Sequence, residues 1–207
     1  MNFHQISHPV ISHKLSFLRD KETKPQEFRG IMNELSRIVV YEATKDLSTT
    51  SISVETPISK ANCERIEDKP ILLSIMRAGN GMLEGALSLL PFASTGHIGI
   101  YRDKFIGNTV EYYFKLPKDY KNHPLILMDP LIATGDTILA CLDRIKNYEV
   151  GKIKIVSILV SPLALEKIEE FHPDVEVYAV SKEEGLNDKG YLLPGIGDAG
   201  DRLYGIQ

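Results

Sequence analysis

The sequence predicts an α/β fold in which a mostly parallel central sheet is flanked by helices. Short apolar runs of strand length alternate along the chain with segments in which apolar residues recur at helical spacing. The runs are nearly continuous, as expected for strands that are buried on both faces of a sheet. Strands that alternate with helices form parallel sheets with right-handed crossover connections.

The first predicted element is an amphipathic helix over residues 28–39, where apolar residues recur at steps of three and four positions. Four apolar runs then predict strands that are buried on both faces. They are residues 71–76, 124–128, 153–160 and 175–180.

Two more helices are expected between these strands. After Asp136-Thr137, one face is shared by apolar residues, namely Ile138, Leu139, Cys141, Leu142 and Ile145. Ser161-Pro162 begins the other helix, because Ser favours the N-cap and Pro favours the first helical position. Residues 110–115, which follow Gly107-Asn108, are expected to form one strand of a β-hairpin arm. Residues 191–200 contain too much Gly and Pro for a helix or a long strand.

Length and composition limit the classes of protein. The 207 residues suit a single domain, 43% of them are hydrophobic, and the formal net charge is -4. This acidic total disfavours a nucleic-acid partner, which would call for a basic surface. The N-terminus lacks the pattern of a signal peptide, and no apolar run is long enough to span a membrane. Cys63 and Cys141 form no metal-binding spacing, so we expect a cytoplasmic protein with ordinary thiols.

Residues 125–137 (LILMDPLIATGDT) predict a phosphate site between a strand and a helix. Ligands of open α/β sheets bind at the carboxyl ends of the strands, and a helix N-terminus offers free N–H groups to an anion. Thr134 and Thr137 add hydroxyl groups, and Gly135 allows the backbone to approach closely. The candidate binding residues are Asp129, Pro130, Leu131, Ile132, Ala133, Thr134, Gly135, Asp136 and Thr137.

Asp129 has the same charge sign as a phosphate, so it suits a pair of vicinal hydroxyls instead. Phosphate and diol together describe a ribose 5-phosphate. The alternative is an ordinary strand–helix turn capped by Thr. The segment resembles the phosphoribosyl pyrophosphate (PRPP) signature of type I phosphoribosyltransferases, and its Asp-Pro pair is typical of the uracil-specific members. Asp136 departs from the family pattern, in which Gly is common, and its side chain should repel a phosphate unless it points away.

Two arginines each follow a strand-like run. Arg77 lies in Met76-Arg77-Ala78-Gly79, and Arg102 lies in Tyr101-Arg102. An arginine binds pyrophosphate well because its planar group donates two parallel hydrogen bonds and stays charged. The alternative for each is a solvated surface side chain. Uracil phosphoribosyltransferases carry similar motifs, and the resemblance implies that both arginines bind the pyrophosphate of the donor. Residues 103–109 would then form a mobile flap.

The C-terminal segment reads YLLPGIGDAGDRLYG over residues 191–205. Its run Pro-Gly-x-Gly-Asp-Ala-Gly-Asp, residues 194–201, is nearly identical to one at the end of uracil phosphoribosyltransferases. Residues 41–47 also resemble the YEATxDL motif of that family. By the resemblance, the backbone of Leu192, Gly197 and Ala199 reads the base, and Asp198 lies at both base and donor. Without the resemblance, the segment is equally well explained as a loose loop or as a turn held by Asp side chains. We call residues 186–207 the hood.

The resemblance implies the type I phosphoribosyltransferase fold over residues 1–207 and the transfer of phosphoribose from PRPP to N1 of uracil, which yields UMP and pyrophosphate. Asp129, Arg77 and Arg102 are the expected catalytic residues. Mg²⁺ is expected to arrive with PRPP, without direct protein ligands. GTP activates some members, and the family forms dimers or tetramers, so GTP is a candidate effector and a homo-oligomer is expected. The alternatives are transfer to a purine or orotate, and a nucleotide-sensing regulator that binds RNA.

Overall fold

The computed structural model describes residues 2–102 and 109–206 of the chain. Within these residues the main sheet contains eight strands. They are β1 (Phe3–Gln5), β4 (Ile71–Met76), β5 (Ser94–Arg102), β6 (Thr109–Lys115), β7 (Leu125–Met128), β8 (Leu131–Ile132), β9 (Ile153–Val160) and β10 (Glu176–Lys182). Seven follow the order β1-β10-β9-β7-β4-β5-β6, and β8 pairs with β9.

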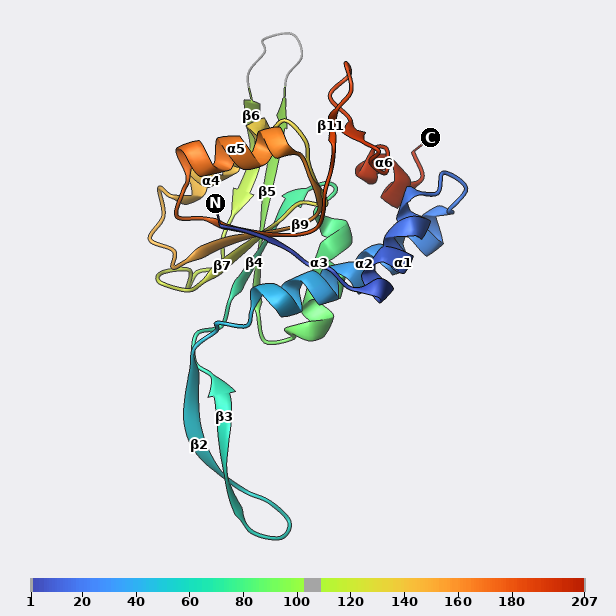
Figure 1. Ribbon diagram of the computed structural model, residues 1–207. Helices are drawn as coiled ribbons and strands as arrows, with labels where there is room; N and C mark the ends of the chain where they lie inside the picture. The colour runs from blue at the N-terminus through green and yellow to red at the C-terminus, as the bar shows by residue number, and fades with distance from the viewer. Residues whose placement is uncertain (1, 103–108, 207) are drawn as a thin grey trace.

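Every pair of neighbouring strands in this sheet is parallel except β5 and β6, which are antiparallel. The predicted α/β class with a mostly parallel sheet is therefore confirmed (Figure 1). The segment expected to be one strand of a hairpin arm is β6, which pairs with β5 at the edge of the main sheet.

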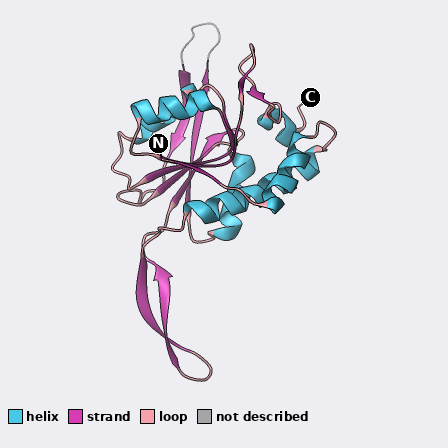
Figure 2. Cartoon of the chain, in the orientation of Figure 1, coloured by secondary structure: helices cyan, strands magenta, loops and turns pink. Residues whose placement is uncertain are grey.

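Helices cover both faces of the sheet (Figure 2). They are α1 (Pro9–Arg19), α2 (Pro25–Ala43), α3 (Asn80–Leu89), α4 (Asp136–Ile145), α5 (Pro162–Phe171) and α6 (Ala199–Tyr204). One buried apolar cluster joins the sheet to α1, α2, α3 and α6, and a second joins it to α4 and α5. Along β4, Leu72 belongs to the first cluster and Leu73 to the second, because successive side chains of a strand point to opposite faces.

Most predicted elements are present, with shifted ends. The helix expected over residues 28–39 is α2, which is longer at both ends, and the strand expected over residues 175–180 is β10, which begins one residue later. Ser161 caps α5 by accepting a hydrogen bond from the N–H of Ala164, as predicted. One expectation was wrong in part. The stretch 191–200 ends in helix, because Asp198 caps the N-terminus of α6 through the N–H of Asp201.

Several elements were not predicted. They include β1, α1, α3 and a hairpin formed by β2 (Thr49–Glu55) and β3 (Lys60–Ile66), which extends away from the rest of the chain (Figure 1). A second short antiparallel pair, β11 (Gly185–Leu186) and β12 (Leu192–Leu193), begins the hood. In the part of the chain that the structure describes, the helices are too short or too polar to cross a membrane.

Candidate active site

The carboxyl ends of three adjacent parallel strands bring the predicted residues to one edge of the sheet. Asp129 directly follows β7, Arg77 directly follows the neighbouring β4, and Arg102 is the last residue of β5. In α/β sheets this edge is where ligands bind. The predicted flap covers residues 103–109, and residues 103–108 lie outside what the structure describes. For Arg102 and Thr109 the structure describes the backbone, which pairs β5 with β6, and not the side chains.

The predicted phosphate turn lies between β8 and α4. The short link after Asp129 is itself a strand, because Leu131 and Ile132 pair with Leu159 and Val160 of β9. Gly135 precedes α4 with a φ of 83°, a backbone conformation that favours glycine. The hydroxyl of Ser161 donates to the carbonyl of Ala133 and fixes the start of the turn. The N–H of Asp136 makes a long hydrogen bond of 3.5 Å to the Thr134 hydroxyl oxygen. The first N–H groups of a helix have no partner within the helix, so the start of α4 suits an anion at this edge.

The negative charge of Asp136 in this turn is paired with a positive charge. Its carboxylate accepts a 2.7 Å hydrogen bond from Nζ of Lys167 in α5, and the Thr134 hydroxyl donates to its other oxygen at 3.1 Å. Lys167 also donates to the backbone carbonyl of Thr134 at 2.9 Å. Sequence reasoning missed Lys167, because its pattern is only that of a polar position on an amphipathic helix.

Asp129 is partly exposed, but its carboxyl group lies deep at the end of β7. Burial raises the pKa of this carboxyl group to about 7, and a long hydrogen bond from the N–H of Leu131, at 3.4 Å, opposes the rise only weakly. A carboxylate held by this long hydrogen bond from the described residues is suited to accept hydrogen bonds from the hydroxyl groups of a sugar.

The loop that carries Arg77 packs against the end of β7 and against α6 of the hood. A Cβ atom on Gly79 would lie 2.5 Å from the carbonyl oxygen of Met128, so only glycine fits between β4 and β7. The Tyr204 hydroxyl donates a 3.0 Å hydrogen bond to the Arg77 carbonyl, and the Arg77 guanidinium lies 3.8 Å from Asp201. The Arg77 side chain itself is 60% exposed and faces solvent at the site.

The hood lies beside this loop. A Cβ atom on Gly200 would lie 4.0 Å from Cβ of Ala78, so the N-terminus of α6 adjoins the residue after Arg77. Among the predicted base-binding residues, the Leu192 and Ala199 side chains are buried, while Gly197 and Asp198 are exposed. Gly197 has a φ of 76°, a backbone conformation that favours glycine.

Three charged residues that sequence reasoning missed anchor the hood. Glu183 is buried and accepts two hydrogen bonds from Arg19 of α1 and one from the N–H of Gly195. Arg19 also donates to the carbonyl of Gly195, and Arg202 donates to the carbonyl of Ile196. Burial acts to raise the pKa of Glu183, but Arg19 and the Gly195 N–H outweigh it, and the pKa falls below its usual value.

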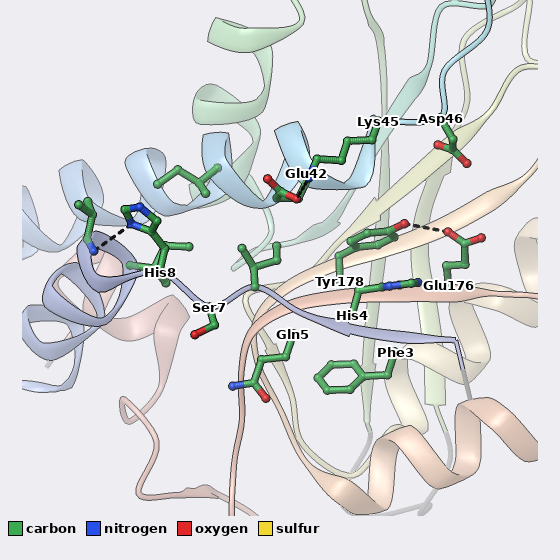
Figure 3. A pocket seen from close by; sticks show the side chains of 14 residues that line it. Phe3, His4, Gln5, Ser7, His8, Glu42, Lys45, Asp46, Glu176 and Tyr178 are labelled. Atoms are coloured by element: carbon green, nitrogen blue, oxygen red, sulfur yellow. Dashed lines mark hydrogen bonds and ion pairs between the residues drawn. The ribbon is translucent and has the colours of Figure 1, made fainter.

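A cavity of about 970 Å³ lies elsewhere, between β1, the C-terminal end of α2 and the start of β10 (Figure 3). Two of its polar pairs are closed within the protein: Tyr178 donates to Glu176, and the ring of His8 accepts from the N–H of Val10. None of the predicted site residues lines this cavity. The carboxyl edge, and not this cavity, is therefore the candidate active site.

The expected Mg²⁺ ion requires oxygen ligands at the candidate site. In the ranges 2–102 and 109–206, no three His, Cys, Asp or Glu side chains are grouped closely enough to hold a metal ion. Asp129 supplies the kind of oxygen that Mg²⁺ prefers. The residues present fit an ion that is bound mainly by a phosphorylated substrate.

The fold and this site define a type I phosphoribosyltransferase. The fold is similar to that of the adenine phosphoribosyltransferase of Trypanosoma brucei, solved with AMP, pyrophosphate and ribose-5-phosphate, with a TM-score of 0.60 and 16% identity over 91% of this chain and 87% of that one. A protein of Aquifex aeolicus is more similar, with a TM-score of 0.93 and 36% identity over 99% of both chains.

The sequence model of the uracil phosphoribosyltransferase family matches residues 5–206. Uracil phosphoribosyltransferases of Symbiobacterium thermophilum and Brucella anthropi are 46% and 44% identical to the chain, over 98% of its length and 97–98% of theirs. The chain belongs to the uracil phosphoribosyltransferase family.

Proposed function

We propose that the chain transfers the 5-phosphoribosyl group of PRPP to N1 of uracil, which gives UMP and pyrophosphate. The observation that carries the proposal is the arrangement at the carboxyl edge. Asp129 and Arg77, the proposed diol-binding and pyrophosphate-binding residues, follow the adjacent strands β7 and β4, the predicted phosphate turn follows β8, and the hood lies beside the Arg77 loop. Similarity to full-length uracil phosphoribosyltransferases supports the same base and the same donor.

In the proposed donor complex, N–H groups from Thr134 to Thr137 and the hydroxyl of Thr137 hold the 5-phosphate, while the Thr134 hydroxyl keeps its hydrogen bond to Asp136. Asp129 accepts the ribose hydroxyls. Arg77 and Arg102 bind the pyrophosphate and stabilise the charge that it gains as it leaves. Such interactions strengthen as the bond breaks, and this is how they accelerate the reaction.

In the reaction the bond between C1 of the ribose and the pyrophosphate oxygen breaks, and a bond from C1 to N1 of uracil forms. The bonding electrons leave with pyrophosphate, and uracil loses its N1 proton. Positive charge develops on the sugar ring, as in glycoside chemistry. Holding both substrates in line supplies much of the rate enhancement, because the reaction becomes effectively intramolecular.

The hood is proposed to select the base through its backbone. Uracil offers an acceptor at O4 and a donor at N3, so it matches one backbone N–H and one carbonyl. Cytosine presents the opposite pattern and would leave buried groups unpaired, which discriminates strongly. The backbone at Leu192, Gly197 and Ala199 is the proposed reader, with Asp198 between base and donor. Anchoring of Gly195 and Ile196 by Glu183 and Arg202 supports a rigid reader.

Mg²⁺ is part of the proposal and is carried by PRPP, where it would neutralise pyrophosphate charge next to Asp129.

Residues 1–207 are proposed to act as one catalytic unit. The unpaired thiols of Cys63 and Cys141 support a cytoplasmic location. The proposed GTP effect rests on the family resemblance, and it is tested by adding GTP to the assay.

A homo-oligomer is supported by the β2–β3 hairpin. The hairpin extends away from the chain body, and Ile58 near its turn is 95% exposed (Figure 1). An isolated two-stranded hairpin is marginally stable in water, so a partner surface would stabilise it. Sedimentation of the purified chain should give a dimer or a tetramer, and a monomer at assay concentration would contradict this part of the proposal.

The activity is tested by supplying PRPP, Mg²⁺ and labelled bases to the purified chain. UMP should form from uracil, and competing cytosine, orotate, hypoxanthine and adenine should give no nucleotide. Formation of a different nucleotide would identify another transferase of the same fold.

Filter binding of RNA at several salt concentrations tests the alternative of an RNA-binding regulator, for which affinity should fall steeply as salt increases.

A further inference from the structure

The ion pair between Asp136 and Lys167 couples the phosphate turn to the neighbouring helix. Asp136 is the first residue of α4, at the end of the helix where anions are expected to bind. A carboxylate at this position has the same charge as the 5-phosphate that the proposed function places there. Its negative charge would weaken donor binding unless another group neutralises it.

Lys167 is placed to neutralise this charge. Its ammonium group lies 2.7 Å from the Asp136 carboxylate, and both side chains are about 30% exposed. Water therefore screens the pair only in part. The Thr134 hydroxyl directs the other carboxylate oxygen back towards the turn.

The same lysine also holds the backbone of the turn. It donates to the Thr134 carbonyl at 2.9 Å, and its aliphatic chain would lie 3.5 Å from a Cβ atom on Gly135. Lys167 thus covers the outer side of Gly135. The lysine therefore holds the turn through its carbonyl side and leaves the N–H groups of the turn for the 5-phosphate of the proposed function.

We propose that Lys167 is a positioning residue for the sugar-phosphate site, which makes the acidic Asp136 compatible with binding the 5-phosphate of the donor. The inference rests on the proposed function for the identity of the ligand. Lys167 acts through Asp136 and the Thr134 carbonyl. Removing both charges should therefore be less harmful than removing the lysine alone.

The test compares KM for PRPP, KM for uracil and the affinity for ribose 5-phosphate across a double-mutant cycle. Lys167→Met should raise KM for PRPP and the Kd of ribose 5-phosphate about tenfold, the effect of one uncompensated charge near an anion at a partly exposed site. KM for uracil should change less than about twofold. Lys167→Met combined with Asp136→Asn should restore both values to within about threefold of the parent, with the remainder due to the lost bond to Thr134. Lys167→Arg should keep most of the affinity, because the charge is retained.

A matched control lies at the other end of the same two helices. Lys146 follows α4 and pairs with Asp174 beyond α5 at 2.6 Å. Lys146→Met removes the same charge from the same helix pair and should leave KM for PRPP unchanged. Thermal unfolding of every variant shows whether the fold is intact.

Three outcomes would overturn the inference: unchanged donor affinity in Lys167→Met, a loss that Asp136→Asn fails to relieve, or an equal loss in Lys146→Met. Ribose 5-phosphate binding needs no turnover, so it separates the inference from the proposed function. If the cycle behaves as expected but uracil yields no UMP, the base assignment fails and the role of Lys167 stands. If the parent chain binds no ribose 5-phosphate, both fail together.

Discussion

Arg19 and Glu183 form a partly buried ion pair with two hydrogen bonds, at N–O distances of 2.6 and 2.8 Å, between helix α1 and the segment that leads into the hood. Only 1% of the Glu183 side chain is exposed, and the same carboxylate accepts the N–H of Gly195. The pair therefore ties the first helix of the chain to the loop that is proposed to read the base.

Replacing Glu183 with Ala should destabilise the fold by about 3 kcal/mol, because a partly buried arginine and the Gly195 N–H lose their partner. KM for uracil should rise more than KM for PRPP, since the hood is the part of the site proposed to contact the base. Urea unfolding and steady-state kinetics measure the two effects. Glu149→Ala, which breaks an exposed pair with Lys121, is the matched control and should change neither.

The pair also has a pH signature. The pKa of Glu183 is lowered in the fold, so its stabilising contribution is present at neutral pH and is lost as pH falls through the folded pKa. The parent chain and Glu183→Gln should therefore differ most in stability at neutral pH and converge in acid. A difference that stays constant down to pH 3 would contradict this account of the pair.

Asp129→Asn should abolish most turnover and yet stabilise the protein above pH 7. The folded pKa of about 7 exceeds the ordinary value of 3.8, so the folded state binds more protons between these values, and stability is lost as pH rises through this range. Removing the ionisable group should recover roughly 1–3 kcal/mol at pH 8. Thermal unfolding at pH 5 and pH 8 tests the sign, and a variant that is less stable at pH 8 would refute it.

Donor affinity should follow the same ionisation. Asp129 accepts ribose hydroxyls best when it is charged, so the affinity for ribose 5-phosphate should rise between pH 6 and pH 8. The Asp129→Asn variant should show a flatter profile, which corrects for the ionisation of the phosphate itself. Equal slopes in the two proteins would exclude Asp129 from the sugar site.

Arg77→Met should raise KM for PRPP at least tenfold and weaken inhibition by pyrophosphate, with little effect on stability. The Arg77 side chain is 60% exposed and lies 3.8 Å from Asp201, too far for a strong ion pair. Arg65→Met, an exposed substitution on the β2–β3 hairpin, controls for loss of a positive charge. Comparable kinetics in both variants would show that Arg77 does not bind the donor.

Gly135→Ala should destabilise the chain by about 1–2 kcal/mol and weaken donor binding, because alanine is strained at a φ of 83° and its Cβ atom would lie 3.3 Å from Cα of Ala164. Gly30→Ala is the matched control within α2, where a Cβ atom meets nothing within 4 Å. That variant should be slightly more stable than the parent, as expected in a helix interior. Denaturant unfolding distinguishes the two directions.

Elements with a strong local pattern were predictable from the sequence. β4 and β9 were predicted with their observed ends, because continuous apolar runs mark strands buried on both faces. Helix α1 was missed, although it buries Ile11, Leu15 and Leu18 and begins with a proline. The β2–β3 hairpin was also missed, because its strands are largely exposed and carry no apolar run.

The candidate site divides in the same way. The turn around Gly135 is a local motif, so its backbone conformation could be anticipated from thirteen consecutive residues of sequence. The ion pairs that support the turn and the hood join distant parts of the sequence. Lys167 lies 31 positions from its partner Asp136 in the turn, and Glu183, which holds the hood, lies 164 positions from Arg19. A polar residue on a surface helix and a glutamate in a charged segment look alike until the fold supplies a partner.

The position of bound UMP tests the proposed active site most directly. Crystals of the chain soaked with UMP should show the phosphate against the N–H groups of residues 134–137, the ribose hydroxyls at Asp129, and the uracil ring against the backbone of residues 192–199. UMP bound at any other surface, with the phosphate turn free of ligand, would contradict the central claim.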